Sequence, residues 1–364
     1  MVLSLLCASA LVLFTNLSQP ANALPNPIKK SGDNDLPFPL SHFTSTVASV
    51  QNTYCGSTYN VPGVKFSDQT LIYALGDGDT EQRANIYHSK SLGIILAYQG
   101  TNLSSFVSSV HNVEAFQTLP DEDLGLPLGS AVFAGFQVAW AGSWNHVKQS
   151  LREAMQEYPE DKVTVTGHSQ GAAIALLGAL SIHHTFGDVI QEVIAYGVPR
   201  VGNAVFATAF DKAFEGKYTG VINGADWVPN LPPQFLNYRH ASGMVWINPA
   251  NTTSWKFYDG QEHSEVSTRK TEMFYPGTLR FNWGDHQGIY MHSSMGTVLG
   301  PCPAQILVVR HILVVFSVHV DEPFLLHRPT GDYEGPTWSC KLLQKYLHHQ
   351  REVVTIDTLV GSDS

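Results

Sequence analysis

The fold of this chain is decided by the stretch KVTVTGHSQGAAIALLGAL, residues 162–180. Val163 and Val165 alternate with threonines, which is typical of a short buried strand. After Gly171 comes an apolar run without proline, whose small residues favour a helix packed closely on a sheet. The stretch therefore predicts a strand that turns directly into a helix, with Ser169 at the turn.

The pattern Gly-x-Ser-x-Gly around Ser169 favours a nucleophilic serine. A strand that reverses into a helix within about four residues forces the turn residue into a strained backbone conformation, and such strain tends to be kept at functional sites. Gly167 and Gly171 stand where side chains would collide with the turn. An ordinary strand–helix connection with two convenient glycines is the alternative that this stretch alone leaves open.

Length and composition indicate one large globular domain. The chain has 364 residues, of which 43% are hydrophobic and 14% charged, enough for a well-buried core. The formal net charge of −10 argues against nucleic acid, and against an anionic membrane surface, as the main partner.

The N-terminus predicts secretion. Residues 1–23 combine an apolar run, Leu3 to Phe14, with an Ala-x-Ala cleavage pattern, as a signal peptide does. The run is too short to span a bilayer, and a later apolar run, 306–320, is interrupted by an arginine and a histidine. We therefore expect an extracellular protein without a transmembrane segment. The sequons at Asn102 and Asn251 fit a glycosylated secreted surface.

Several segments alternate between strand and helix patterns. Residues 24–40 form a flexible lead-in rich in Pro and Asn, and residues 41–54 and 133–158 have helical spacing. The expected strands are Leu92–Tyr98, Val163–Thr166, Glu192–Tyr196 and Tyr218–Asn223. This alternation predicts an α/β fold with a mostly parallel sheet flanked by helices. Chemistry in such folds gathers at the carboxyl ends of the strands.

A serine nucleophile needs a base, usually an imidazole oriented by a carboxylate. In sheet hydrolases the chain order is Ser, then Asp or Glu, then His, so the partners are sought after Ser169. Asp226 follows an expected strand and begins the segment DWVPNLPP, whose prolines stiffen the loop. A capped turn is the alternative role for this carboxylate. Asp188 and Asp211 have the polar surroundings of solvated charges.

The base is chosen from sixteen histidines. His286 lies in a late loop between two glycines and is the preferred candidate, with His292 as the second choice. The remaining candidates are expected to lie elsewhere: His168 in packing, pointing away from the serine hydroxyl; His183 and His184 on the helix after the turn; and His240 just ahead of a strand-like segment.

Taken together, these motifs resemble the class 3 lipases of fungi. The matching segments are GHSQG (167–171), YGVPRVGN (196–203), DWVPNLPP (226–233), YRHASG (238–243) and DHQGIY (285–290), with YCGS (54–57) and YQGTN (98–102) ahead of them. The resemblance covers about residues 40–302 and implies an α/β-hydrolase domain with a mixed, mostly parallel sheet. It makes Ser169 the nucleophile, Asp226 the acid and His286 the base.

Two backbone or side-chain donors are expected to bind the oxyanion of the tetrahedral intermediate, each contributing about 3–4 kcal/mol. One is the N–H of Gln170, the residue after the nucleophile. The resemblance places the other at Thr101, in the loop after the Leu92–Tyr98 strand. Leucine is usual in the family at position 170, but only the backbone is required there.

Residues 103–113 predict a lid. Leu103, Phe106, Val107 and Val110 share one helical face, with serines largely opposite. Family lipases carry a short amphipathic helix here that covers the site and opens at a lipid surface. An ordinary surface helix is the alternative.

The ends of the family domain carry cysteines. Cys7 leaves with the signal peptide, so Cys55, Cys302 and Cys340 remain, an odd number in a secreted chain. The resemblance implies a disulfide between Cys55 and Cys302, which leaves Cys340 as the odd thiol.

The resemblance stops at residue 304. We expect residues 305–364 to be either an added segment with a strand at 306–320 or translated non-coding sequence, and we favour the second interpretation.

These observations predict a secreted, monomeric serine esterase that acts at a lipid–water interface through an acyl-enzyme. Acylglycerols are the favoured substrates, as for a triacylglycerol lipase. A feruloyl esterase acting on plant cell walls and a non-catalytic lipid-binding protein are the alternatives. No cofactor is expected, because no His, Cys or carboxylate cluster has the spacing of metal ligands.

Overall fold

The structure is a computed structural model that describes residues 36–100, 116–263, 266, 283–297 and 300–304. The chain divides into two compact units, Met1–Ile312 and Leu313–Ser364, and all the described residues lie in the first. The lid segment 103–113, Thr101 and Asn102 lie outside the described residues, as do the signal segment and residues 305–364.

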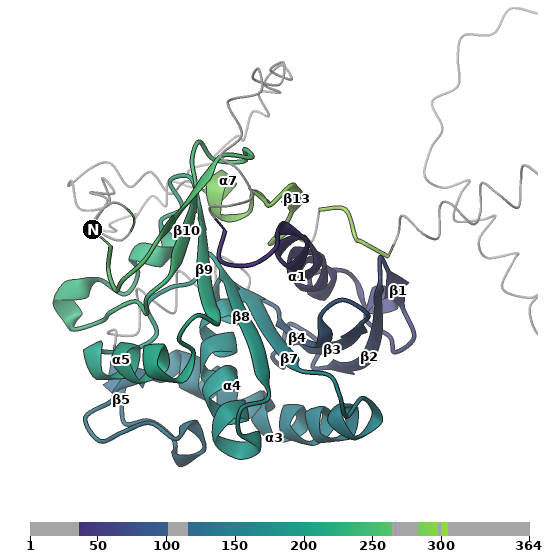
Figure 1. Ribbon diagram of the computed structural model, residues 1–364, viewed down its shortest axis with the longest axis horizontal. Coiled ribbons are helices and arrows are strands. Elements are labelled where there is room, and N and C mark those ends of the chain that lie inside the picture. The colour runs from purple at the N-terminus through teal and green to yellow at the C-terminus, as the bar shows by residue number, and fades with distance from the viewer. Residues whose placement is uncertain (1–35, 101–115, 264–265, 267–282, 298–299, 305–364) are drawn as a thin grey trace, which may run out of the picture. The chain divides into compact units, whose positions relative to one another are not determined.

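A nine-stranded sheet forms the centre of the first unit (Figure 1). Its strands lie in the order β1-β2-β3-β4-β7-β8-β9-β10-β11. They are β1 (Lys65–Phe66), β2 (Gln69–Leu75), β3 (Ala84–Ser89), β4 (Gly93–Tyr98), β7 (Val163–His168), β8 (Ile190–Tyr196), β9 (Tyr218–Asn223), β10 (Met244–Ile247) and β11 (Trp255–Tyr258). Two small hairpins lie outside it, β5 (Gln117–Thr118) with β6 (Val132–Phe133) and β12 (Ile289–Tyr290) with β13 (Ser293–Ser294).

The sheet is mixed. The five central strands, β4 and β7 to β10, pair in parallel, while β1 to β4 at one edge and β10 with β11 at the other pair antiparallel. This confirms the predicted fold class, an α/β-hydrolase with helices around a mixed sheet. The antiparallel strands β1 to β3 were not predicted, because their polar and apolar residues do not alternate cleanly.

Helices cover both faces of the sheet. Helix α1 (Leu40–Thr53) packs on one face, where Phe43, Val47 and Val50 join a buried cluster. Helices α3 (Ala134–Glu157), α4 (Gln170–Phe186) and α5 (Ala204–Ala213) contribute to the larger cluster on the other face (Figure 1).

Side chains of β4 alternate between these two faces. Ile94, Leu96 and Tyr98 belong to the cluster under α3 and α4, whereas Ile95 and Ala97 belong to the cluster under α1. This is the two-residue period of a strand that is buried on both sides, and it explains why the segment is a continuous apolar run.

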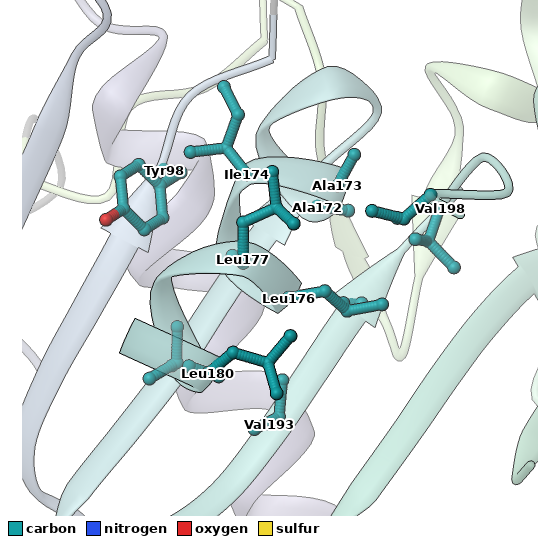
Figure 2. Packing of buried hydrophobic residues seen from close by; sticks show 14 of the residues in the cluster. Tyr98, Ala172, Ala173, Ile174, Leu176, Leu177, Leu180, Val193 and Val198 are labelled. Atoms are coloured by element: carbon teal, nitrogen blue, oxygen red, sulfur yellow. The ribbon is translucent and has the colours of Figure 1, made fainter. Parts of the chain in front are cut away.

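Helix α4 packs against the sheet, α3 and α5, and its residues Gly171–Ile182 are all buried. Its side chains share one buried cluster with residues of the strands; in Figure 2 Ala172 and Ala173 lie towards Val198, and Leu180 lies near Val193. A Cβ added at Gly178 would lie 3.0 Å from the Tyr98 hydroxyl, so this glycine permits the close approach.

The predicted elements correspond to observed ones within a few residues. The segments 41–54, 133–158 and 163–166 are α1, α3 and β7, and the other three expected strands are β4, β8 and β9. Among the described residues no helix combines the length and the apolar character that crossing a membrane requires.

Candidate active site

The strand–helix turn after β7 forces Ser169 into a rare backbone conformation. Its φ is 59° and its ψ is −129°, which L-residues seldom adopt. A Cβ at Gly167 would lie 2.3 Å from the carbonyl oxygen of Gly171, and a Cβ at Gly171 would lie 2.4 Å from that of Gln99. Only glycine therefore fits at both positions, because each neighbour is backbone that cannot move aside.

Parallel pairing brings the ends of three strands together at this turn. The pairs His168↔Tyr196 and Tyr196↔Val221 align the carboxyl ends of β7, β8 and β9. The Ser169 N–H donates to the Tyr196 carbonyl at 2.9 Å, which fixes the nucleophile candidate beside the end of β8. Asp226 comes three residues after the end of β9, at Asn223, and so at the same edge of the sheet.

Asp226 and His286 form a fully buried pair at this edge. Nδ1 of His286 lies 2.9 Å from Oδ2 of Asp226, and neither side chain is exposed to solvent. Because a carboxylate only accepts, Nδ1 carries the proton and Nε2 is left as a proton acceptor. The Asp226 carboxylate also accepts the Val228 N–H at 3.0 Å and the Tyr290 hydroxyl at 3.3 Å, which fixes its orientation.

Two buried atoms at this edge have unused hydrogen-bonding capacity. Neither Oγ of Ser169 nor Nε2 of His286 has a hydrogen-bond partner in the part of the chain that the structure describes. The His286 ring and the Asp226 carboxylate lie beside the residue that follows β8, because a Cβ at Gly197 would lie 2.9 Å from each of them. Unsatisfied buried polar atoms are unfavourable, so they mark a site that a substrate or a reaction completes.

The loop that carries Asp226 is held by a buried ion pair. Arg200 pairs with Glu262 at 2.8 Å and donates from Nη1 to the carbonyls of Asn230 and Pro232. Interactions with His240 and Arg200 lower the pKa of Glu262 to about 2, although burial acts in the opposite direction. The segments YGVPR and DWVPNLPP are therefore joined through one guanidinium group.

His240 lies in this same cluster and not beside Ser169. Its Nε2 lies 2.7 Å from the Pro229 carbonyl, and its backbone N–H donates to Glu262. Burial lowers the pKa of His240 to about 4, so the ring is neutral at physiological pH. It acts on the Asp226 loop through contacts with backbone.

A separate polar cluster holds the short helix α7 (Trp283–His286). Asn223 donates to the Asp285 carbonyl at 2.8 Å, and the Ala225 N–H donates to the Asp285 carboxylate at 2.7 Å. Oδ1 of Asn251 accepts from Asn223 and from the Ile289 N–H. The loops that carry Asp226 and His286 are thus joined by this cluster as well as by the Asp226–His286 contact.

The N–H of Gln170 is the first of helix α4, where the helix dipole favours negative charge. The other expected donor, Thr101, lies outside the described residues. Gly100, the residue before it, is described: a Cβ there would lie 3.0 Å from the Cβ of Ser169, so backbone passes directly beside the nucleophile candidate.

The disulfide between Cys55 and Cys302 is present, with the Cα atoms 5.9 Å apart. It joins the residue after Tyr54, which follows α1, to the segment that follows β13. Among the described residues no group of three or more His, Cys, Asp or Glu side chains is placed to hold a metal ion.

Four supporting residues were not identified from the sequence: Arg200, Glu262, Tyr290 and Asn223. Arg200 lies within the quoted segment YGVPRVGN, and a buried arginine in an apolar segment is a signal for an ion pair. Its partner is 62 residues away and carries no local pattern that would have revealed it.

Comparisons with known proteins place these observations in a family. The family model described as "Lipase (class 3)" matches residues 95–236. The secreted mono- and diacylglycerol lipase 3 of Gibberella zeae is 64% identical over 82% of this chain and 93% of its own length. The secreted mono- and diacylglycerol lipase MDL2 of Malassezia globosa is 41% identical over 74% of this chain and 87% of its own.

Solved structures agree on the fold. The lipase from Rhizopus microsporus var. chinensis aligns with a TM-score of 0.59 at 24% identity, covering 77% of this chain and 96% of that one. Lipase II from Rhizopus niveus aligns with a TM-score of 0.58 at 23% identity, covering 71% and 97%. The 64% identity to the Gibberella zeae lipase, over most of both chains, shows that this chain belongs to the class 3 lipase family and is a carboxylic ester hydrolase.

Proposed function

We propose that this protein is a secreted lipase that hydrolyses mono- and diacylglycerols, with Ser169 as nucleophile, His286 as base and Asp226 as the carboxylate that orients it. The observation that carries the proposal is the buried Asp226–His286 pair at the edge of the sheet where Ser169 is held at φ 59°. The unused Oγ of Ser169 and Nε2 of His286 supply the acid–base couple that ester hydrolysis needs.

Acylation begins when Nε2 of His286 accepts the proton of the Ser169 hydroxyl. Oγ then bonds to the ester carbonyl carbon, and the carbonyl π electrons move to oxygen to give a tetrahedral oxyanion. When this intermediate collapses, the bond to the glycerol oxygen breaks, and His286 returns its proton to that oxygen. The partial acylglycerol or glycerol leaves, and the fatty acyl group stays on Ser169.

Deacylation repeats these steps with water. His286 takes a proton from water, the hydroxide oxygen bonds to the acyl carbon, and Oγ of Ser169 leaves and recovers the proton. The product is a fatty acid and the enzyme is regenerated. Asp226 stays ionised throughout and stabilises the imidazolium that forms twice in each cycle.

The backbone N–H of Gln170 and a donor at Thr101 stabilise the oxyanion in this proposal. The position of Gln170 at the first turn of α4 supports its role, because the backbone amide there points along the helix axis towards the nucleophile. Removal of one such donor costs about 3–4 kcal/mol of transition-state stabilisation.

The choice among acylglycerols follows the relatives. Two relatives that are 64% and 41% identical to this chain over the aligned residues are named as mono- and diacylglycerol lipases, whereas the motifs alone favour a triacylglycerol lipase. Initial rates on emulsified mono-, di- and trioleoylglycerol and on methyl ferulate test this choice, with Ser169→Ala as the control.

The rates on these four substrates test both the proposed substrate class and the proposed nucleophile. Faster hydrolysis of mono- and dioleoylglycerol than of trioleoylglycerol supports the proposal. Preference for trioleoylglycerol or for methyl ferulate contradicts the proposed substrate, and activity that survives in Ser169→Ala contradicts the proposed nucleophile. Binding of lipid without any hydrolysis would leave only a lipid-binding protein.

We further propose that the enzyme works as a monomer at a lipid–water interface, with residues 103–113 as a lid. Exposed apolar side chains support a lipid contact: Phe116 and Leu119 are 57% and 78% exposed, and Phe235 is 74% exposed. Gln117 donates to the Leu236 and Asn237 carbonyls and so joins these two segments. A rise in activity when a short-chain ester passes its solubility limit is expected; no rise contradicts the lid.

A further inference from the structure

A buried hydrogen-bonded chain connects the backbone on one side of Ser169 to the base loop on the other. The Gly100 N–H lies 3.0 Å from the Tyr54 hydroxyl, which lies 2.7 Å from Nδ1 of His168. Nε2 of His168 lies 2.9 Å from the backbone carbonyl of His286. His168 directly precedes Ser169 in the sequence, and from the sequence alone we predicted only a packing role for it.

Only one arrangement of protons satisfies every contact. The His286 carbonyl can only accept, so Nε2 of His168 carries the proton and its Nδ1 accepts. The Tyr54 hydroxyl then donates to Nδ1, and its oxygen accepts the Gly100 N–H. Burial, with a smaller contribution from His286, lowers the pKa of His168 well below its ordinary value, which keeps the ring neutral as this arrangement requires.

Packing holds the two side chains in place. The ring of His168 lies with its centroid 4.5 Å from that of His286 and 5.9 Å from that of Tyr54. A Cβ at Gly296 would lie 2.5 Å from Cε1 of His168, so the ring has no room to move on that side. Both side chains are nine-tenths buried or more.

The outer end of the chain is fixed covalently. Tyr54 is followed by Cys55, whose disulfide to Cys302 joins the end of α1 to the segment after the base loop. The tyrosine is therefore anchored in the backbone beside it, and its hydroxyl faces backbone in direct contact with Ser169, since a Cβ at Gly100 would lie 3.0 Å from the Ser169 Cβ.

We propose that Tyr54 and His168 are positioning residues for ester hydrolysis, which set the distance between the Gly100 backbone and the His286 loop on either side of Ser169. This rests on the proposed function. Neither side chain hydrogen-bonds to the reacting atoms; both act by holding the backbone on either side of Ser169. A misplacement of about 1 Å in such groups costs roughly 100-fold in rate.

Tyr54→Phe and His168→Gln test this role. The phenylalanine keeps the ring but loses both hydroxyl contacts. The glutamine amide can still donate to the His286 carbonyl, but it has no acceptor at the position of Nδ1, where the Tyr54 hydroxyl donates. Tyr87→Phe is the matched control: Tyr87 is another buried tyrosine, whose hydroxyl contacts Asn52, Asn85 and the Ser49 carbonyl.

The measurements are kcat and KM on a soluble short-chain ester and the unfolding temperature. Rates are divided by the amount of enzyme that a fluorophosphonate titrates, so misfolded protein does not count. Tyr54→Phe is expected to lower kcat by about 10- to 100-fold with KM within a factor of about three, and the double variant with His168→Gln to be no slower than the slower single variant. Tyr87→Phe is expected to lose thermal stability to a similar extent with kcat unchanged.

If Tyr54→Phe and His168→Gln keep kcat within about twofold while losing stability as Tyr87→Phe does, the pair is merely structural and the proposal is wrong. If Tyr54→Phe does not fold, the comparison rests on His168→Gln, for which the same outcomes apply. A wild-type protein without any esterase activity would instead reject the proposed function, so the two failures are distinguishable.

Discussion

Oδ2 of Asp226 and Nδ1 of His286 lie 2.9 Å apart with both side chains fully buried, although sixty residues separate them in the chain. Three contacts bring this about: the Arg200–Glu262 pair holds the loop of Asp226, Asn223 holds the carbonyl of Asp285, and Tyr290 spans both loops. A buried carboxylate is tolerated only where hydrogen-bond donors satisfy it, and one donor to Asp226 is the Nδ1–H of His286, which fixes the tautomer of that ring.

Asp226→Asn tests this directly. The asparagine amide can donate to Nδ1, which moves the ring proton to Nε2 and removes the acceptor for the Ser169 proton. We expect kcat to fall by about 10,000-fold. Asp211→Asn is the control, because Asp211 is a partly buried carboxylate that accepts from Ser242 and Gln261. Loss of kcat in both variants to the same extent would contradict the assigned role.

Gly171→Ala is expected to abolish activity and destabilise the fold. The added Cβ would meet the carbonyl oxygens of Gln99 and Tyr98 at 2.4 and 2.6 Å, so either α4 or the end of β4 must shift. At Gly142, within α3, an added Cβ meets nothing within 4 Å. Gly142→Ala should therefore raise the free energy of unfolding by about 0.5–1 kcal/mol, and thermal unfolding of both variants measures the contrast. Equal stability of the two variants would show that the turn tolerates a side chain.

Acid should destabilise the protein through its buried neutral histidines. The pKa of His240 is lowered by burial to about 4 from an ordinary 6.5, so the unfolded chain binds more protons between these values. The contribution is complete above pH 6.5 and is lost as the pH falls towards 4. It amounts to on the order of 3 kcal/mol.

Urea unfolding at pH 7 and pH 4 measures this loss. His240→Gln keeps a donor for the Pro229 carbonyl but takes up no proton, so its stability should fall less on acidification than that of the wild type. An equal fall in both proteins would mean that the acid sensitivity arises elsewhere. The pKa of Glu262 is lowered to about 2, so this carboxylate takes up its proton at a lower pH than His240 does. The two contributions to acid destabilisation can therefore be told apart by measuring stability as a function of pH.

The elements around Ser169, which are β4, β7 and α4, could be predicted from the sequence alone. In each of them the spacing of apolar residues matches the face or faces that the element buries. Asp226 was predicted as the acid because it follows a strand, and His286 as the base because glycines flank it, and the structure brings these two side chains into contact. The Arg200–Glu262 pair and the His168–Tyr54 contact escaped prediction for the same physical reason. Both depend on side chains that come into contact only after the sheet has brought distant segments together. Such contacts leave no pattern in the local sequence of either segment.

Cys302→Ala should cost about 4 kcal/mol in stability. The disulfide joins residues 247 positions apart, and closing so long a loop removes much of the conformational entropy of the unfolded chain. Unfolding temperatures with and without reductant give the same comparison in the wild type. A wild-type temperature that does not respond to reductant would contradict the prediction.

The boundaries of the mature chain remain a prediction that mass spectrometry of the secreted protein can check. We expect the first residue to follow Ala23, and we expect no peptides from beyond residue 305. Glycopeptides containing Asn102 or Asn251 are expected in the same digest. Peptides from 305–364 would show that this segment is translated and kept.

The central claim is that Ser169 is the nucleophile, and a fluorophosphonate tests it most directly. After inactivation of the wild-type protein, digestion and mass spectrometry should find one phosphonyl group on Ser169, and esterase activity should fall in step with labelling. Asp226→Asn should be labelled far more slowly, because its His286 cannot accept the serine proton. A phosphonyl group on another residue, or full esterase activity in Ser169→Ala, would contradict the account.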